Sequence, residues 1–361
     1  MQNVLVLDGW YMNIKNLIIA VFLLMILSTT ASVYAEQNLT KTITDMAGRT
    51  VTVPTHISGV LGTSPPTTML IYMVAPDRLI GWNSNNTGFL PEKYLTLPTV
   101  GGWFGGREGN YESFLAIHPD IILEGYNQQG DMKATVDGRQ AKFGELPVVG
   151  VENSVDVLGY AKPIRFMGDL LGESDQADKM ITFYESLHSQ VNSTVSKIPD
   201  NNKVTVYPAA GVDGLTTEVK GSPHAQLIDV AGGINVVDEP LTDAFGEIEV
   251  SMEQVITWNP EVIIVEDAGL YKKMFADPLW YQIKAVQNKR VYLTPRTPFS
   301  WYDHPPGVNR IIGIAWTAKM LYPDEFKDID LNQLIKDFHS IFLHFEISDD
   351  QIKAALNPDM A

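Results

Sequence analysis

One pattern of residues occurs in both halves of the chain and limits what it can fold into. Residues 112–124 (ESFLAIHPDIILE) and 253–265 (EQVITWNPEVIIV) each begin a helical stretch with Glu, end it at Pro, and continue with an acidic residue and an aliphatic strand. Proline ends a helix because it lacks the backbone N–H and clashes with the preceding turn. Helices that alternate with short aliphatic strands are typical of parallel α/β sheets. The pattern therefore predicts two α/β lobes of similar design.

The other expected elements follow the same alternation. A helix is predicted to begin at Ser64, because Ser caps helices and the two prolines after it fit a first turn. Further helices are predicted at residues 111–117, 225–231 and 252–258. Strands are predicted at residues 57–61, 78–82, 120–124, 148–151, 204–207, 234–237, 262–266 and 290–293.

A long amphipathic helix is predicted between the two lobes. Apolar residues keep helical spacing from Ser174 to Lys197, and Ser174 is expected to cap this helix. The fold class is thus α/β, with two similar lobes joined by one long helix and a ligand cleft between them. The expected boundaries are an N-terminal lobe at 36–173, the helix at 174–198, a C-terminal lobe at 199–361, and a binding domain overall at 57–325.

The N-terminus has the composition of a secretory signal peptide. Lys15 precedes the apolar run 17–27, and small residues at 33 and 35 suit cleavage after Ala35. Residues 1–35 are therefore the expected signal peptide, and Met12 would be a more ordinary start than Met1. The alternative is an uncleaved anchor, since the residues after the run could lengthen its helix. Either way the protein is expected to be exported, in the periplasm or at the cell surface.

Composition excludes several classes of function. The 361 residues carry a net charge of −17, which repels phosphate backbones, so no nucleic-acid partner is expected. The chain has no cysteine, which excludes disulfides, thiolate metal sites and the acylated Cys of a lipoprotein. No nucleophile elbow, phosphate-binding loop, zinc-protease helix or dinucleotide fingerprint is present. The protein is therefore expected not to be an enzyme, and to need no cofactor.

These features together resemble a known family, the substrate-binding proteins of ABC importers for iron chelates and cobalamin. The resemblance covers nearly all of residues 41–323 and includes the tail 338–356. It rests on residues 44–54 (TDMAGRTVTVP), both Glu-to-Pro units, residues 232–235 (GGIN), and residues 299–306 leading into 307–323. It implies a rigid helix between two lobes, small hinge motion, and a monomer that binds a small-molecule metal chelate.

The resemblance also implies that each lobe presents one glutamate to an arginine pocket of the membrane permease. By position in the motif these are Glu112 and Glu253. A glutamate in the first turn is also favoured by the helix dipole, and capping alone is the alternative explanation. Capping does not explain why the residue recurs ahead of equivalent strands in both halves.

Loops that leave the carboxyl ends of strands are the expected walls of the cleft, because open α/β sheets bind ligands there. Aromatic rings can stack on a chelate, while Arg and Tyr hold its polar edge. The alternative is that the aromatic residues pack into the core or cap a helix. The candidate ligand-binding residues are Trp103, Phe104, Arg107, Tyr126, Tyr207, Trp301, Tyr302 and His304.

No directly bound metal is expected, because the seven histidines are scattered without HxH or HxxxH spacing. His304 is expected to donate a hydrogen bond or to touch a metal inside its chelator. Arginines are few, with Arg107 and Arg296 the best placed, which argues against a highly anionic ligand.

The predicted function is capture of a metal chelate, such as an iron–siderophore or a corrinoid, for delivery to an ABC permease. A binding protein for a nickel or haem complex is an alternative within this class. A secreted hydrolase is a rival that would need Ser300, Asp303 and His304, which crowd one short loop. A cell-surface adhesion or scaffold protein is a third possibility.

Overall fold

The computed structural model describes residues 39–85, 89–104, 107–126, 131–152, 156–241 and 246–357. The predicted signal peptide, residues 1–35, lies outside the described residues. One compact unit consists of residues 1–43 and 52–56, and another consists of residues 44–51 and 57–361. The first unit contains most of β1 (Thr40–Thr44) and β2 (Thr50–Pro54), which form a two-stranded sheet. All other elements belong to the second unit.

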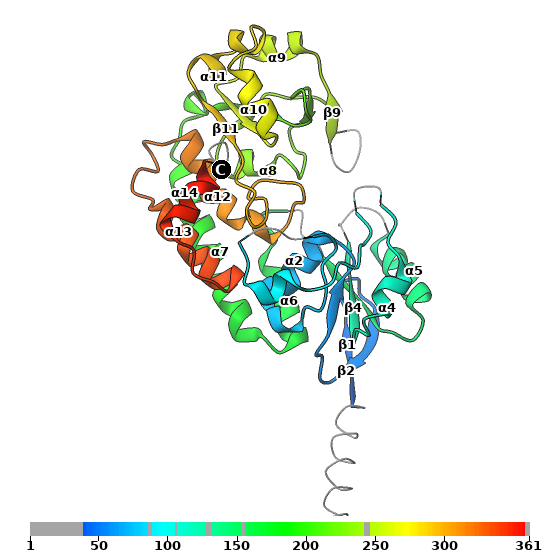
Figure 1. Ribbon diagram of the computed structural model, residues 1–361. Coiled ribbons are helices and arrows are strands. Elements are labelled where there is room, and N and C mark those ends of the chain that lie inside the picture. The colour runs from blue at the N-terminus through cyan, green and yellow to red at the C-terminus, as the bar shows by residue number, and fades with distance from the viewer. Residues whose placement is uncertain are drawn as a thin grey trace, which may run out of the picture. The chain divides into compact units, whose positions relative to one another are not determined.

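The N-terminal sheet of the second unit is parallel, with strand order β3-β4-β5. Its strands are β3 (Val60–Gly62), β4 (Ile121–Tyr126) and β5 (Val148–Glu152). Helices α4 and α5 lie beside β4 (Figure 1). The helical segments of this region are α2 (Pro65–Val74), η1 (Pro76–Arg78), α3 (Glu92–Leu95), α4 (Tyr111–Leu115), α5 (Met132–Phe143) and α6 (Ala161–Leu171).

The C-terminal sheet is also parallel, with strand order β11-β10-β6-β8. Its strands are β6 (Thr205–Ala209), β8 (Ile234–Asn235), β10 (Val262–Val265) and β11 (Val291–Leu293). A separate antiparallel sheet consists of β7 (Thr216–Glu218) and β9 (Glu247–Glu249), and the sequence did not predict it. The helical segments are η2 (Asp200–Asn202), α8 (Gln226–Val230), α9 (Met252–Trp258), α10 (Ala268–Met274), η3 (Trp280–Gln282), α11 (Lys284–Gln287), η4 (Val308–Arg310), α12 (Ile311–Leu321), α13 (Leu331–Phe338), the π-helix η5 (His339–Leu343) and α14 (Asp349–Leu356).

The predicted long helix is confirmed as α7 (Ser174–Val195). It packs against α6, which follows the N-terminal sheet, and against α12, which belongs to the C-terminal region. The predicted cap is wrong: the N-cap residue is Glu173, and the Ser174 hydroxyl donates to Asp169 at 3.0 Å instead. Its apolar face is buried, at Ala177, Met180, Ile181, Tyr184, Leu187 and Val191.

The two repeated units have the same local geometry. Helix α4 is followed by His118 and helix α9 by Asn259, and both residues adopt left-handed backbone conformations, with φ of 51° and 42°. The acidic residue after each proline then bonds at the start of the neighbouring strand of its sheet: Asp120 Oδ2 accepts from the Gly59 N–H beside β3 at 2.8 Å, and Glu261 Oε2 accepts from the Thr205 N–H of β6 at 3.2 Å. The structure therefore confirms two lobes of like design.

One predicted strand, residues 78–82, is wrong. Pro76 begins the short helix η1, and beyond it Leu79 and Trp82 form only single bridges, to Val60 and Thr99. Proline fixes the backbone angle that a helical turn needs, so the turn replaces the start of the strand. The other predicted strands coincide with β3, β4, β5, β6, β8, β10 and β11 to within a few residues.

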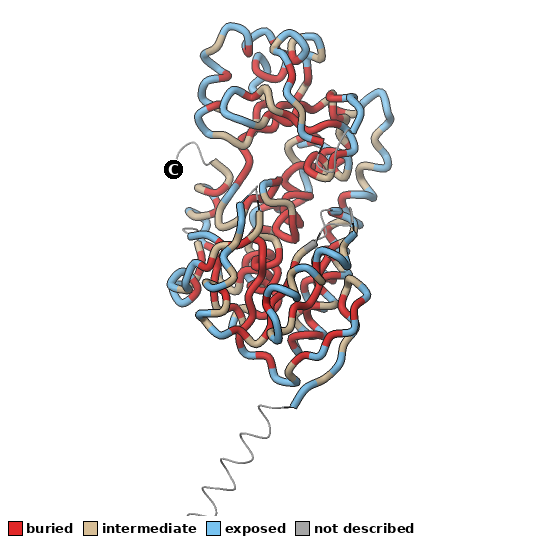
Figure 2. Tube along the Cα trace, turned by 90° about the vertical axis from the view of Figure 1, so that its right-hand side faces the viewer, coloured by how far each residue is buried: buried red, intermediate tan, exposed pale blue. Residues whose placement is uncertain are grey.

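The core follows the two parallel sheets. Every residue of β5 and β10 is buried, which is typical of strands covered by helices on both faces. Figure 2 shows the buried residues gathered in the interior of the trace, with the exposed ones on its outer turns. Among the described residues, no helix is both long and apolar enough to cross a membrane.

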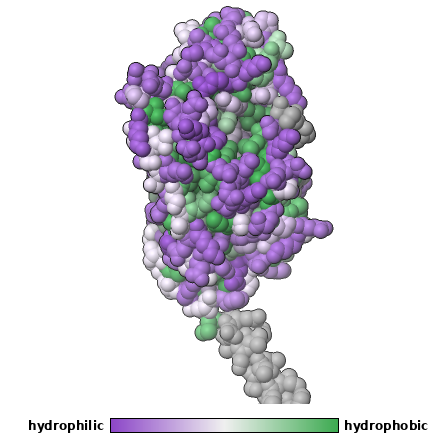
Figure 3. Space-filling view, turned by 90° about the vertical axis from the view of Figure 1, so that its left-hand side faces the viewer, coloured by the Kyte–Doolittle hydropathy of each residue, from purple (hydrophilic) through white to green (hydrophobic). Residues whose placement is uncertain are grey.

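A groove of about 520 Å³ lies between α7 and α13. Figure 3 looks onto the side that carries α13 and α14, where apolar surface gathers within a largely hydrophilic face. Phe183, Leu187, Leu334 and Ile341 provide the apolar part of the groove.

His339 is a buried histidine that lies against the rings of Phe338 and Phe345, and no described residue forms a hydrogen bond to either of its ring nitrogens. Burial lowers its pKa to about 4. Below about pH 6.5 the unfolded chain binds a proton that the folded chain does not, so stability is lost as the pH falls from about 6.5 to 4.

We predict that His339→Leu removes up to about 3 kcal/mol of this pH dependence, measured by urea unfolding at pH 7.5 and 4.5. An unchanged difference between the two pH values would contradict it.

Candidate functional site

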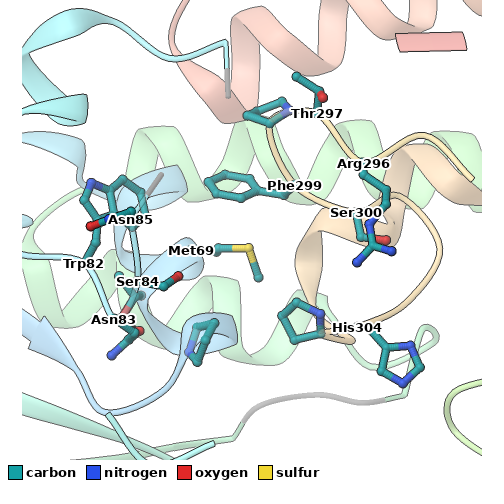
Figure 4. Close-up of a pocket in the computed structure, with 14 residues that line it drawn as sticks. Met69, Trp82, Asn83, Ser84, Asn85, Arg296, Thr297, Phe299, Ser300 and His304 are labelled. Carbon is teal, nitrogen blue, oxygen red and sulfur yellow. Dashed lines mark hydrogen bonds between the residues drawn. The ribbon is translucent and has the colours of Figure 1, made fainter. Parts of the chain in front are cut away.

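A cavity of about 290 Å³ lies where residues after β3 face the loop 296–305. Figure 4 shows Trp82, Asn83, Ser84 and Asn85 on one side and Arg296, Thr297, Ser300 and His304 on the other, with Met69 and Phe299 between them. Pro65 and Arg296, which line it, follow the carboxyl ends of β3 and β11, and open α/β sheets bind ligands at such ends. This cavity combines apolar walls with several converging polar groups, which is the usual composition of a small-molecule site.

Asn83 holds the N-terminal wall together. Its amide donates to the carbonyls of Gly62 at 2.9 Å and Gly101 at 2.7 Å, and its Oδ1 accepts from the Thr68 hydroxyl at 2.6 Å. These bonds tie the end of β3, the first turn of α2 and the loop at 101 to one buried side chain. Asn83 therefore fixes the shape of this wall rather than its chemistry.

The opposite wall is the loop 296–305, which is anchored to α12. Trp301 is 1% exposed, and the Asn309 amide donates to the carbonyls of Ser300 and Pro305. Gly313 allows the loop backbone to lie against the helix: a Cβ at this position would stand 1.8 Å from the Trp301 carbonyl oxygen. The loop is thus held by a close contact that only glycine permits.

Two cationic side chains lie on this wall and share one carboxylate. Glu266 follows β10, and its side chain accepts from His304 Nδ1 at 3.0 Å and lies 3.8 Å from the Arg296 guanidinium. The hydrogen bond with Glu266 raises the pKa of His304 to about 9. His304 is therefore protonated at neutral pH, and the two positive charges on this wall are shared with the one carboxylate of Glu266.

A second, much smaller cavity lies behind His304, at the ends of β6 and β10. His224 Nδ1 donates to Asp303 Oδ2 at 2.6 Å, and His304 Nδ1 lies 3.2 Å from the same oxygen. The two imidazole rings stack with centroids 5.4 Å apart. Glu218 lies beside them and accepts from the Ser222 hydroxyl at 3.1 Å. We call Glu218, His224, Asp303 and His304 the His–carboxylate cluster.

Burial governs the ionisation of this region. It raises the pKa of Glu218 to about 7, despite the nearby His224. Burial likewise raises the pKa of Tyr302 well above its ordinary value, so its hydroxyl keeps its proton. The surroundings of Glu218 therefore do not fully offset the cost of burying its negative charge.

Of the predicted ligand residues of the N-terminal lobe, Trp103, Phe104 and Arg107 are not among the described residues that line the cavity. Trp103 packs on Tyr111 and Phe114, and the Arg139 guanidinium lies 3.7 Å from its ring centroid. Phe104 is half-buried and Arg107 is exposed, while residues 105–106 and the side chain of Tyr126 lie outside the described part. The arrangement of Trp103 corresponds to the packed alternative. Ligand roles for Trp103, Phe104, Arg107 and Tyr126 stay predictions.

In the C-terminal lobe, two of the predicted ligand residues line a cavity and two do not. Tyr207 is fully buried and donates to the Gly214 carbonyl at 2.8 Å, and Trp301 anchors its loop. Tyr302 lines the small cavity, and His304 lines both cavities. The rival hydrolase gains no support, because Ser300 Oγ accepts from the Asp303 N–H at 3.3 Å and, among the described residues, no hydrogen bond joins it to His304.

Several lining residues were not predicted from the sequence. Met69, Trp82, Asn83, Ser84, Asn85 and Phe299 line the cavity, and Glu218, His224 and Glu266 surround the small one. The strand-end rule could have identified Glu266, which directly follows β10. Nothing in the spacing of Glu218 and His224 pointed to Asp303, which lies 79 residues after His224.

The predicted docking residues occupy equivalent exposed positions. Glu112 and Glu253 lie in the first turns of α4 and α9. Asn110 and Ser251 cap these helices through their own side chains, so the glutamates are not needed as caps. Their docking role stays a prediction.

Comparison with known proteins adds the family context. The family model described as periplasmic binding protein matches residues 70–298. The molybdate-binding protein MolA of Haemophilus influenzae is 26% identical over 92% of this chain and 97% of its own length. A solved ABC transporter solute-binding protein from Sulfurospirillum deleyianum is 32% identical, with a TM-score of 0.80 over 88% of this chain and 99% of its own. Helicobacter pylori CeuE, solved as a Ni–His complex, shares the fold at 16% identity, with a TM-score of 0.67 over 88% of this chain and 99% of its own.

We predict that Gly313→Ala displaces the loop 296–305, because the new Cβ would overlap the Trp301 carbonyl. Overpacking of this kind costs about 1–3 kcal/mol, measurable by urea unfolding. Gly138→Ala is the matched control: Gly138 lies within α5 with open space around it, and alanine there should stabilise the fold by about 0.5–1 kcal/mol. Equal effects of the two substitutions would contradict the anchoring role of Gly313.

Proposed function

The chain belongs to the periplasmic binding protein family, and from this premise we propose that it captures a small metal-bearing anion in the 290 Å³ cavity and delivers it to an ABC permease. Its relatives are solute-binding proteins rather than enzymes. The proposal places the ligand between the Asn83 wall and the loop 296–305.

The charge of the cavity carries this proposal. Its described lining contains Arg296 and His304 but no carboxylate, although the chain as a whole has a net charge of −17. Arg offers a planar fork of donors that suits carboxylate and oxyanion groups. The hydroxyl and amide groups of Ser84, Asn85 and Thr297 can complete the polar contacts. An anionic ligand is therefore favoured, in contrast with the expectation drawn from the small number of arginines.

The volume of the cavity limits the size of the ligand. About 290 Å³ is at the lower end of the range for sites that enclose drug-sized molecules, roughly 300–1,000 Å³. A corrinoid or haem would be only partly enclosed, whereas an oxyanion or a compact chelate fits. The name of the relative MolA supports a metal oxyanion, and a compact ferric chelate with anionic arms has the same charge. Trp82 and Phe299 provide apolar contact for the organic part of such a chelate.

Delivery is proposed to use Glu112 and Glu253 as the docking residues of the two lobes. Their exposure, their equivalent places in the repeat and their independence from helix capping support this role. The relatives that are named as periplasmic support an exported location for this chain, which agrees with the signal peptide expected at residues 1–35.

We predict that Arg296→Gln weakens binding of the preferred anion at least about tenfold, because a charge-assisted hydrogen bond is lost. Isothermal titration with molybdate, sulfate, ferric citrate, haem and cobalamin identifies the preferred ligand. Arg165→Gln, on the exposed face of α6, is the matched control and should leave affinity unchanged. Preference for a neutral or large ligand, or equal affinity in the Arg296→Gln protein, would count against the proposal.

We also predict that the double substitution Glu112→Arg and Glu253→Arg abolishes uptake while solute binding persists. The two new arginines would face the arginine pockets expected in the permease, and like charges repel. Uptake in cells and binding by the purified protein are measured in parallel. Glu92→Arg combined with Glu346→Arg reverses two other exposed glutamates and should preserve uptake. Transport that survives the first pair would show that docking uses other residues.

A further inference from the structure

The small cavity behind His304 has room for a single ion or water and not for an organic molecule. Its volume is about 10 Å³, close to the minimum of roughly 10–15 Å³ that a single water needs. Its lining includes Glu218, His224, Tyr302, Asp303 and His304. The occupant that this cavity suits is therefore a single ion or a single water.

The side chains around it form a set of metal-ligating groups. Each residue of the His–carboxylate cluster offers one ligand atom, and these atoms all lie within 4.8 Å of one another. Four ligands around a tetrahedral zinc ion, with bonds of about 2.1 Å, lie about 3.4 Å apart. A contraction of the cluster would bring its wider pairs to this spacing, while the hydrogen-bonded His224 Nδ1–Asp303 Oδ2 pair, at 2.6 Å, would lengthen to it.

Buried polar atoms without a hydrogen-bond partner give an independent indication of a ligand. Among the residues that the structure describes, Asp303 is 1% exposed with no partner for its Oδ1, and Tyr302 is 3% exposed with no partner for its hydroxyl. Both residues line the small cavity. An unpartnered buried oxygen is costly, and a carboxylate oxygen more so, unless something bonds to it.

We infer that Glu218, His224, Asp303 and His304 bind one divalent transition-metal cation directly, at a site that lies beside the solute cavity and does not depend on the function proposed above. His304 ligates as a neutral imidazole, so the cation displaces the proton from Nε2 while Nδ1–H stays bonded to Glu266. Two imidazoles and two carboxylates suit borderline cations such as Zn²⁺, Ni²⁺ and Co²⁺, whereas Mg²⁺ and Ca²⁺ prefer oxygen alone. This inference revises the expectation that no metal is bound directly.

Surrounding groups hold the ligands in place. Glu266 accepts from His304 Nδ1, and the Ser222 hydroxyl donates to Glu218 while accepting from the His224 N–H at 3.1 Å. Outer groups of this kind orient metal ligands in known sites. His304 itself has a left-handed backbone, with φ of 47°, and its Nδ1 lies 3.0 Å from Glu266 Oε2 and 3.2 Å from Asp303 Oδ2.

A bonded network without any ion is the competing explanation. Such a network accounts for the His224–Asp303 and His304–Glu266 contacts. Within the described part of the chain it leaves Asp303 Oδ1 and the Tyr302 hydroxyl without partners, which a cation and its bound water would satisfy. The cluster also places two carboxylates around a space too small for any organic cation.

The test uses purified protein stripped with a chelator and titrated with Zn²⁺, Ni²⁺, Co²⁺ or Mg²⁺ in the absence of any anionic solute. We expect one Zn²⁺, Ni²⁺ or Co²⁺ per chain and no stoichiometric Mg²⁺ binding by calorimetry and native mass spectrometry. His224→Gln and Glu218→Gln should each weaken Zn²⁺ binding at least about 100-fold. His188→Gln on α7 is the matched control and should bind as the unmodified protein does.

X-ray absorption spectroscopy of the unmodified protein loaded with Zn²⁺ needs no variant, so it tests the site even if a variant fails to fold. The spectrum should show two imidazole ligands on the zinc ion. Absence of stoichiometric binding, equal affinity in the cluster variants, or a zinc shell without imidazole would each overturn the inference. Failure of the solute panel alone would contradict the proposed function and leave the cation result unaffected.

Discussion

The close contact between the loop 296–305 and α12 is the constraint on which both cavities depend. Gly313 permits it, and Asn309 holds the carbonyls of Ser300 and Pro305. The loop presents Arg296 and Phe299 to the larger cavity and Asp303 to the smaller one. Because its backbone is fixed by a helix of the core, these side chains are positioned without a ligand, and little conformational entropy opposes binding.

The net charge of the whole chain does not reveal the charge of the cavity wall. The net charge of −17 keeps most of the surface negative, but Glu266 gathers Arg296 and His304 onto one wall. An interaction inside a partly desolvated cavity is stronger than one across the solvated surface. Two local positive charges can therefore decide the sign of the ligand although the carboxylates of the whole chain outnumber them.

The sequence predicted the elements whose stability is local or periodic, and failed where distant segments meet. Helix α7 and the repeated helix–proline–strand units were predictable because apolar spacing and proline act within one segment. Trp103 shows what spacing leaves open: its glycine neighbours suit a binding loop, the fold brings Arg139 and Tyr111 against its ring, and its ligand role stays a prediction. The approach of His224 to Asp303 across 79 residues depends on the sheet order, which sequence spacing does not encode.

His304 lines both cavities, so binding at one site is physically coupled to binding at the other. Its ring faces Asp303 and Glu266, and it also lines the larger cavity. A cation held by the cluster would lie on the same wall as Arg296, so an anion in the larger cavity would meet positive charge from both. Any effect of the cation on anion affinity must then equal the effect of the anion on cation affinity, because coupling between two binding sites is reciprocal.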